Sequence, residues 1–157
     1  MRRNCKKFIS MLMAVVMIFA MSATAFAAPN ATALTNAKFL RDTGKDLPLG
    51  MGDGVISGGT IEGDTIIVNT KAYERLLFTG YIKSAKYVDD SGNGYGSELI
   101  TVDDNGNGVL ILDINEKTST PTGGVGIYLE LSFKMSPFTP PGMKDTMKAY
   151  FTCDNLK

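Results

Sequence analysis

The stretch FKMSPFTPPGMKDTMKAYFTC, residues 133–153, decides the fold. It holds a loop rich in proline and glycine between two segments in which apolar and polar residues alternate. The apolar positions are Ile127, Leu129, Leu131 and Phe133 before the loop and Met147, Ala149, Phe151 and Cys153 after it. Alternation with a period of two on both sides of such a loop predicts a β-hairpin with one buried face.

Outside this hairpin, the sequence predicts further short strands and shows no pattern typical of a long helix. Strands are expected at residues 37–41, 60–61, 65–68, 81–88, 98–102 and 109–114. Residues 73–77 fit a helical turn or a strand equally well, and residues 48–54, PLGMGDG, fit a loop. Short strands separated by turns rich in Gly, Asp and Asn predict an all-β sandwich.

The first residues have the pattern of an export signal. Arg2, Arg3, Lys6 and Lys7 precede an apolar run over residues 8–21, and Ala25-Phe26-Ala27 gives the small-x-small pattern of a cleavage site. The run is shorter than the roughly 20 residues of a membrane-spanning helix. We therefore expect a signal peptide over residues 1–27, a flexible lead-in over 28–36 and one domain over 37–157. The mature chain is expected to be secreted, either extracellular or loosely attached to the cell wall, without membrane insertion.

Composition excludes several functional classes. The leader holds four of the sixteen Lys and Arg residues and none of the sixteen acidic ones, so the mature chain carries 12 − 16 = −4. A mildly acidic chain without a basic block is not expected to bind nucleic acid. The chain has no histidine, the commonest general base and zinc ligand, and no tryptophan. We therefore expect no enzyme, and the few aromatic residues leave little to form a platform for a sugar.

The methionines of the mature chain fall into two groups. Met135 and Met147 share the alternation of their apolar neighbours, so we expect them to fill the core. Met51 instead stands between glycines in a loop, and Met143 follows Pro-Pro-Gly at the mouth of the hairpin. The residues alone leave open whether Met51 and Met143 bind a ligand or simply pack. Cys153 lies on the apolar side of the last strand, where a core position is expected.

Several short motifs follow one another in a familiar order. They are GMGDG (50–54), FTGYI (78–82), LELSF (129–133), PPGM ending at Met143, and AYF (149–151). In this order they resemble the Shp-type haem-binding domains of Gram-positive cell surfaces. That family has the immunoglobulin-like sandwich of the NEAT haem-transport modules. The likeness covers residues 37–154.

The resemblance implies a cofactor and its ligands. A b-type haem would be held by the thioethers of Met51 and Met143, with Met147 as the alternative to Met143. The two sulfur atoms would then face each other across a slot wide enough for the porphyrin. NEAT modules use a Tyr-x-x-x-Tyr pair instead, and Tyr150 has no such partner here, which favours methionine. Tyr128 and Tyr150 could stack on the porphyrin.

The resemblance also implies a function, and two others compete with it. The chain would carry haem in an uptake relay and pass it to a cell-surface haem receptor or transporter protein, catalysing no reaction. In the first alternative, the chain is a non-catalytic adhesion or cell-wall-associated module in which all four methionines pack. In the second, Met143, Met147 and Cys153 bind copper(I), because soft sulfur ligands select that ion.

Overall fold

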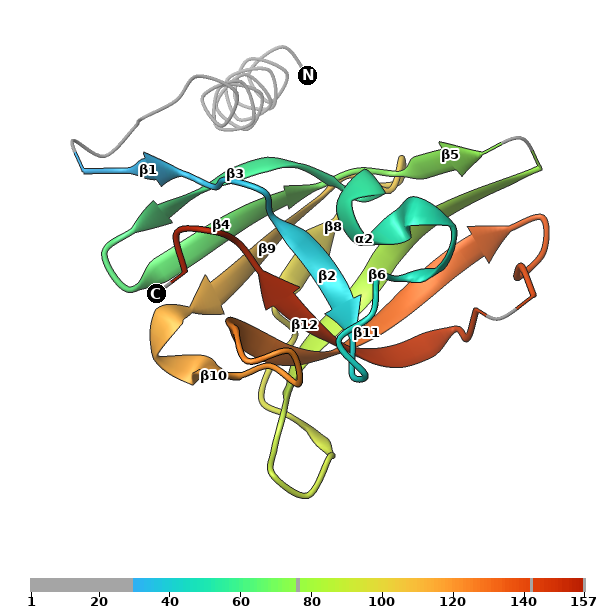
Figure 1. Cartoon of the computed structure of the whole chain (residues 1–157). Coiled ribbons are helices and arrows are strands. Elements are labelled where there is room, and N and C mark those ends of the chain that lie inside the picture. The colour runs from blue at the N-terminus through green and yellow to red at the C-terminus, as the bar shows by residue number, and fades with distance from the viewer. Residues whose placement is uncertain (1–29, 76, 142, 157) are drawn as a thin grey trace, which may run out of the picture. The chain divides into compact units, whose positions relative to one another are not determined.

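Two antiparallel β-sheets pack face to face and form a sandwich, as the alternation along the sequence predicts (Figure 1). The computed structural model describes residues 30–156, apart from residues 76 and 142. The expected signal peptide, residues 1–27, lies outside the described residues. None of the helices within the described range is long and apolar enough to cross a membrane.

The first sheet has five strands in the order β1-β3-β4-β9-β8. These strands are β1 (Thr32–Ala33), β3 (Ile56–Glu62), β4 (Thr65–Thr70), β8 (Ile100–Val102) and β9 (Gly108–Asp113). Alternate residues of its central strands, Ile66, Val68, Leu110 and Leu112, point inward and are buried. One face of this sheet therefore supplies half of the core.

The second sheet contains the predicted hairpin and has the order β2-β12-β11-β6-β5, with β10 added on β11 and β7 on β6. Its strands are β2 (Lys38–Arg41), β5 (Tyr73–Arg75), β6 (Phe78–Val88), β7 (Gly94–Tyr95), β10 (Lys117–Ser119), β11 (Val125–Ser136) and β12 (Thr146–Thr152). The register pairs Ile127 with Phe151 and Leu131 with Met147. This pairing and the burial of Ile127, Leu129, Leu131 and Phe133 confirm the hairpin and its apolar face.

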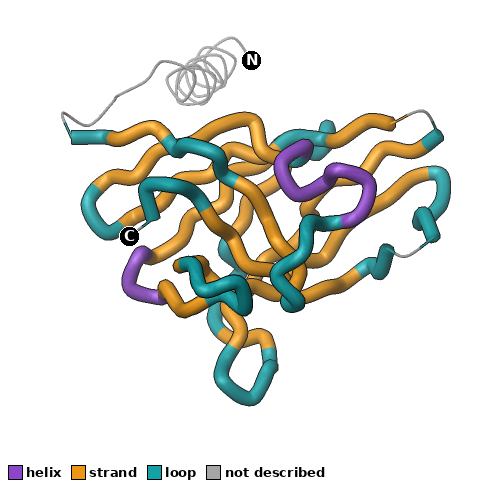
Figure 2. Tube along the Cα trace, in the orientation of Figure 1, coloured by secondary structure: helices purple, strands orange, loops and turns teal. Residues whose placement is uncertain are grey.

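Short helices occur at two places in the described part of the chain (Figure 2). Residues 48–54, expected to be a loop, form the 3-10 turn η1 (Pro48–Gly50) followed by α2 (Met51–Gly54). A second 3-10 turn, η2 (Ile114–Glu116), follows β9. Left-handed backbone at Leu49 (φ 62°) and Gly50 (φ 77°) separates η1 from α2. Residues 73–77 fitted a helical turn or a strand equally well, and residues 73–75 form the strand β5.

The core lies between the two sheets, and two phenylalanine rings pack against each other within it. The rings of Phe39 in β2 and Phe151 in β12 are buried, with their centroids 5.6 Å apart. Cys153 is buried as expected, and burial raises the pKa of its thiol. Met135 and Met147, predicted to fill the core, are only partly buried and pack against the core from its margin.

Candidate functional site

The short helix α2 places Met51 inside the sandwich. Its side chain is 0% exposed and belongs to the core. A β-carbon added at Gly80 of β6 would lie 3.1 Å from Cε of Met51 and 3.3 Å from Cγ of Met135. Since Gly80 pairs with Met135 in the sheet, Met51 packs over the junction of β6 and β11. Glycine at position 80 is what leaves room for the Met51 side chain.

The mouth of the hairpin brings Met143 to the same end of the sheet. Beyond the last paired residues, the Phe133 N–H donates to the Asp145 carbonyl (2.7 Å), and the Met143 N–H donates to the Pro140 carbonyl (3.1 Å). Met143 is 7% exposed and belongs to the same buried cluster as Met51. We call this end of the sandwich, which holds Met51, Met135 and Met143, the methionine end.

Apolar side chains surround the methionine end. The ring of Phe78 in β6 lies 6.5 Å from that of Tyr73 and 6.5 Å from that of Phe138, measured between centroids. Phe138 comes from the hairpin loop and is exposed, as are Leu49 in η1 and Leu77 between β5 and β6. Three exposed apolar residues therefore come from three segments at this end of the sandwich, and we call them the apolar rim.

Two hydrogen bonds hold η1 on this end of the sandwich. The carbonyl oxygen of Leu49 accepts from the Tyr73 hydroxyl (2.8 Å) and from Nη1 of Arg75 (2.6 Å). Leu49 itself is left-handed, a backbone conformation that costs a residue with a β-carbon about 1–2 kcal/mol. The segment preceding Met51 is thus strained and fixed chiefly through one carbonyl group.

The predicted slot between the two methionines is absent from the described structure. Met51 and Met143 are both buried in the core, with 0% and 7% of their surface exposed. The cavity beside α2, of about 950 Å³, is lined by Gly50, Gly52 and Asp53 but not by Met51. The expectation that the sulfurs face each other across an open space was therefore wrong for this conformation. Their role as ligands stays a prediction.

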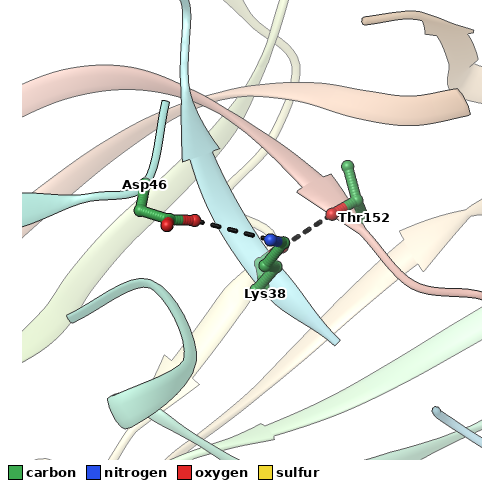
Figure 3. A network of polar contacts seen from close by, with 3 residues as sticks. All are labelled: Lys38, Asp46 and Thr152. Atoms are coloured by element: carbon green, nitrogen blue, oxygen red, sulfur yellow. Dashed lines mark hydrogen bonds and ion pairs between the residues drawn. The ribbon is translucent and has the colours of Figure 1, made fainter. Parts of the chain in front are cut away.

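On the side of that cavity, polar contacts join β2 to its neighbours (Figure 3). Nζ of Lys38 lies 3.4 Å from Oδ1 of Asp46, and the Thr152 hydroxyl donates to the Lys38 carbonyl (3.4 Å). Asp46 is 80% exposed, and exposed ion pairs contribute about 0–1 kcal/mol. These contacts add little stability and leave the packing of α2 on β2 to apolar residues.

The two tyrosines predicted to stack on the porphyrin do not join the methionine end. Tyr128 pairs with Tyr150 near the start of β11, seven residues before Met135, or roughly 23 Å along the strand. They alternate with the buried residues Ile127 and Leu129, so they lie on the outer face of the sheet, whereas Met51 is inside. The prediction that all four residues line one site was therefore wrong.

The structure does not bring Cys153 close enough to Met147 for both to bind one copper(I) ion. Met147 lies near the start of β12, and Cys153 directly follows the end of that strand. Six residues of extended chain separate them by roughly 20 Å. One ion cannot reach both sulfur atoms. Among the described residues, no group of three or more His, Cys, Asp and Glu side chains could hold a metal ion.

Comparisons with known proteins do not assign the chain to a family. No protein-family model, no curated protein and no solved structure matches it. The resemblance inferred from the short motifs, and the immunoglobulin-like topology that it implies, therefore stay predictions.

The sequence pointed to Met51 and Met143 but not to Gly80. A glycine inside a strand marks a place where another group approaches closely, so the FTGYI segment carried a usable signal. We expect Gly80→Ala to lower the free energy of unfolding by about 1–3 kcal/mol, because its methyl group would crowd Met51 and Met135. Urea denaturation followed by circular dichroism measures this loss.

The control for this substitution is Gly63→Ala, at a turn where an added β-carbon meets no atom within 4 Å. Gly63 has a positive φ of 60°, so its substitution reports backbone strain without crowding. If Gly80→Ala destabilised the protein no more than by a few tenths of a kcal/mol, the packing of Met51 over Gly80 would be contradicted.

Proposed function

We propose that the chain binds haem between α2 and the mouth of the β11–β12 hairpin, with Met51 and Met143 as the two iron ligands, and carries it to a partner protein. Export of the chain and a cell-surface receptor as the acceptor belong to the same proposal. One observation carries it: two methionines far apart in the sequence, one in α2 and one at the hairpin mouth, are both buried in the core at the end of the sandwich where β6 begins and β11 ends. An exposed apolar rim surrounds that end.

The donor atoms at the methionine end suit such a ligand. Thioether sulfur is a soft, neutral donor that needs no deprotonation. Haem iron held by two thioethers favours the ferrous state and keeps no position open for oxygen, which suits transport. Phe78, Phe138 and Leu49 offer the apolar contact surface that a porphyrin requires.

Binding requires α2 to move away from the hairpin. Exposing the two buried methionine side chains costs about 4–6 kcal/mol, which lowers an apparent affinity by about a thousandfold to ten-thousandfold. Because micromolar binding corresponds to about 8 kcal/mol, the contacts with haem must supply about 12–14 kcal/mol for a micromolar affinity. Strain at Leu49 lowers the cost further, because opening releases it.

A second candidate is favoured by the complete burial of Met51. In a non-catalytic adhesion or cell-wall-associated module, the methionines would only pack, and no opening of α2 would occur. The exposed rim of Leu49, Leu77 and Phe138 would then contact another protein. The two candidates differ in whether any sulfur atom reaches iron.

Haem titration of the purified chain, in ferric and dithionite-reduced form, separates the candidates. We expect a six-coordinate, low-spin visible spectrum in the wild type. Met51→Leu and Met143→Leu keep the apolar volume but remove the sulfur, so each should give a five-coordinate or water-ligated spectrum. Met147→Leu is the matched control and should leave the spectrum unchanged. Loss of the six-coordinate spectrum in Met147→Leu but not in Met143→Leu would reassign the second ligand.

Two results would reject the haem proposal. One is a wild-type chain that adds no absorbance band beyond free haem. The other is a haem spectrum that Met51→Leu and Met147→Leu leave equally intact. Either result, with circular dichroism unchanged, favours the second candidate.

A further inference from the structure

Four of the six tyrosines of the chain line one groove away from the methionine end. Tyr87, Tyr95, Tyr128 and Tyr150 line a groove of about 760 Å³. They come from four different strands, β6, β7, β11 and β12. We call this site the tyrosine groove. Tyr87 is partly buried and packs against the core, but Tyr95, Tyr128 and Tyr150 are not core residues, so core packing does not explain why they gather at this site.

The four rings are arranged in two pairs. Tyr128 and Tyr150 stack with their centroids 4.5 Å apart and their planes 16° from parallel. Tyr87 and Tyr95 lie 5.9 Å apart at 35°. The Tyr95 hydroxyl donates to Oε2 of Glu116 (2.8 Å), and the Tyr87 hydroxyl accepts from the Asp113 N–H (2.8 Å). These bonds fix the second pair, so the groove has preformed aromatic walls.

The polar lining of the groove offers both hydrogen-bond donors and acceptors. Asp89, Asp90 and Glu116 supply carboxylates and Lys117 an ammonium group, a charge of −3 + 1 = −2. Ser91, Asn115 and Thr118 add neutral polar groups. Glu116 raises the pKa of Tyr95 to about 12, first through their hydrogen bond. The Tyr95 phenol therefore stays neutral at physiological pH.

We propose that the tyrosine groove binds a neutral carbohydrate. The face of a tyrosine ring is negative, and it attracts the weakly positive C–H groups on the flat side of a sugar ring. Sugar hydroxyls both donate and accept, so they can pair with carboxylates, ammonium and amide groups together. The negative charge of the lining disfavours acidic glycans. No local sequence pattern predicts this platform, because its tyrosines are far apart along the chain.

The inference stands apart from the haem proposal. The tyrosine groove is lined by polar side chains, and none of its lining residues belongs to the methionine end. Substitutions in the groove should leave the haem spectrum unchanged. Conversely, Met51→Leu should leave carbohydrate binding unchanged.

Affinity electrophoresis in gels that contain soluble xylan, mixed-linkage β-glucan, galactomannan or chitosan tests the proposal. We expect at least one of the three neutral polymers to retard the chain. Hexasaccharides of that polymer then serve for titration by tyrosine fluorescence, which is not masked because the chain has no tryptophan. Tyr128→Ala should weaken binding about tenfold or more, because it removes a stacking face. Tyr128→Phe keeps the ring and should retain most of the affinity.

The matched control is Tyr81→Ala, a tyrosine of the same sheet that does not line the groove. It should bind as the wild type does. Three results would overturn the proposal: no retardation by any neutral polymer, equal weakening by Tyr81→Ala and Tyr128→Ala, or binding to cationic chitosan alone. The last result would assign the groove to a cationic ligand. Circular dichroism of each variant shows that it is folded.

Discussion

Replacing Met51 with alanine is expected to lower the free energy of unfolding by about 2–5 kcal/mol. The side chain is fully buried, and its Cε lies 3.1 Å from the position that a β-carbon at Gly80 would take. Alanine would leave a cavity under α2, a helix too short to hold its position without the core. Urea denaturation monitored by circular dichroism gives the loss as a shift in the midpoint at constant slope.

Two further variants show whether the loss comes from the cavity. Met51→Leu restores most of the volume and should cost less than about 1.5 kcal/mol. Met135→Ala removes a partly buried side chain at the margin of the same cluster and should cost less than Met51→Ala. A Met51→Ala variant as stable as the wild type would show that α2 does not need this anchor.

The second large loss of stability is expected when Phe151 is replaced. Phe151→Ala should cost about 3–5 kcal/mol, because the ring is fully buried and packs on Phe39. The destabilisation should affect β2 first, because the four residues of β2 pair only with β12 among the named strands. Hydrogen exchange should therefore show lost protection in β2 before it does in β11. Thermal melting measures the overall loss.

Phe138→Ala is the control for this substitution. The ring is of the same type but lies exposed in the hairpin loop, so its loss should change stability by no more than about 0.5 kcal/mol. Equal destabilisation by Phe138→Ala and Phe151→Ala would contradict the division between core and rim described for the second sheet.

The hairpin could be predicted because its signal is local. Alternation over residues 127–133 and 147–153 fixes which side chains share a face, and the structure buries that face. The helix α2 could not be predicted in the same way. Four residues with two glycines show no helical period, and Gly52 lies so close to β2 that an added β-carbon would meet the Phe39 carbonyl at 2.6 Å. Tertiary packing decides this segment.

The candidate site was predictable only in part for a related reason. Met51 and Met143 were singled out by their loops and by the resemblance, and they do belong to one cluster. The burial of Met51 depends on Gly80 and on the register of β6 with β11, which no local sequence pattern predicts. The alternation along β11 and β12 places Tyr128 and Tyr150 on the outer face, but it carries no information about which end of a strand meets which loop.

The shortness of the outermost strands has a consequence for association. In the first sheet the outer strands are β1, with two residues, and β8, with three; in the second they are β2, with four, and β5, with three. Unpaired edges are where foreign chains add to a sheet, and short ones present few free peptide groups. The long strand β11 has strand partners on both sides, whereas β6 pairs on its outer side only with β5, through Phe78–Gly80, and with β7, through Tyr87 and Val88. The short outer strands themselves therefore offer a second molecule little backbone to extend.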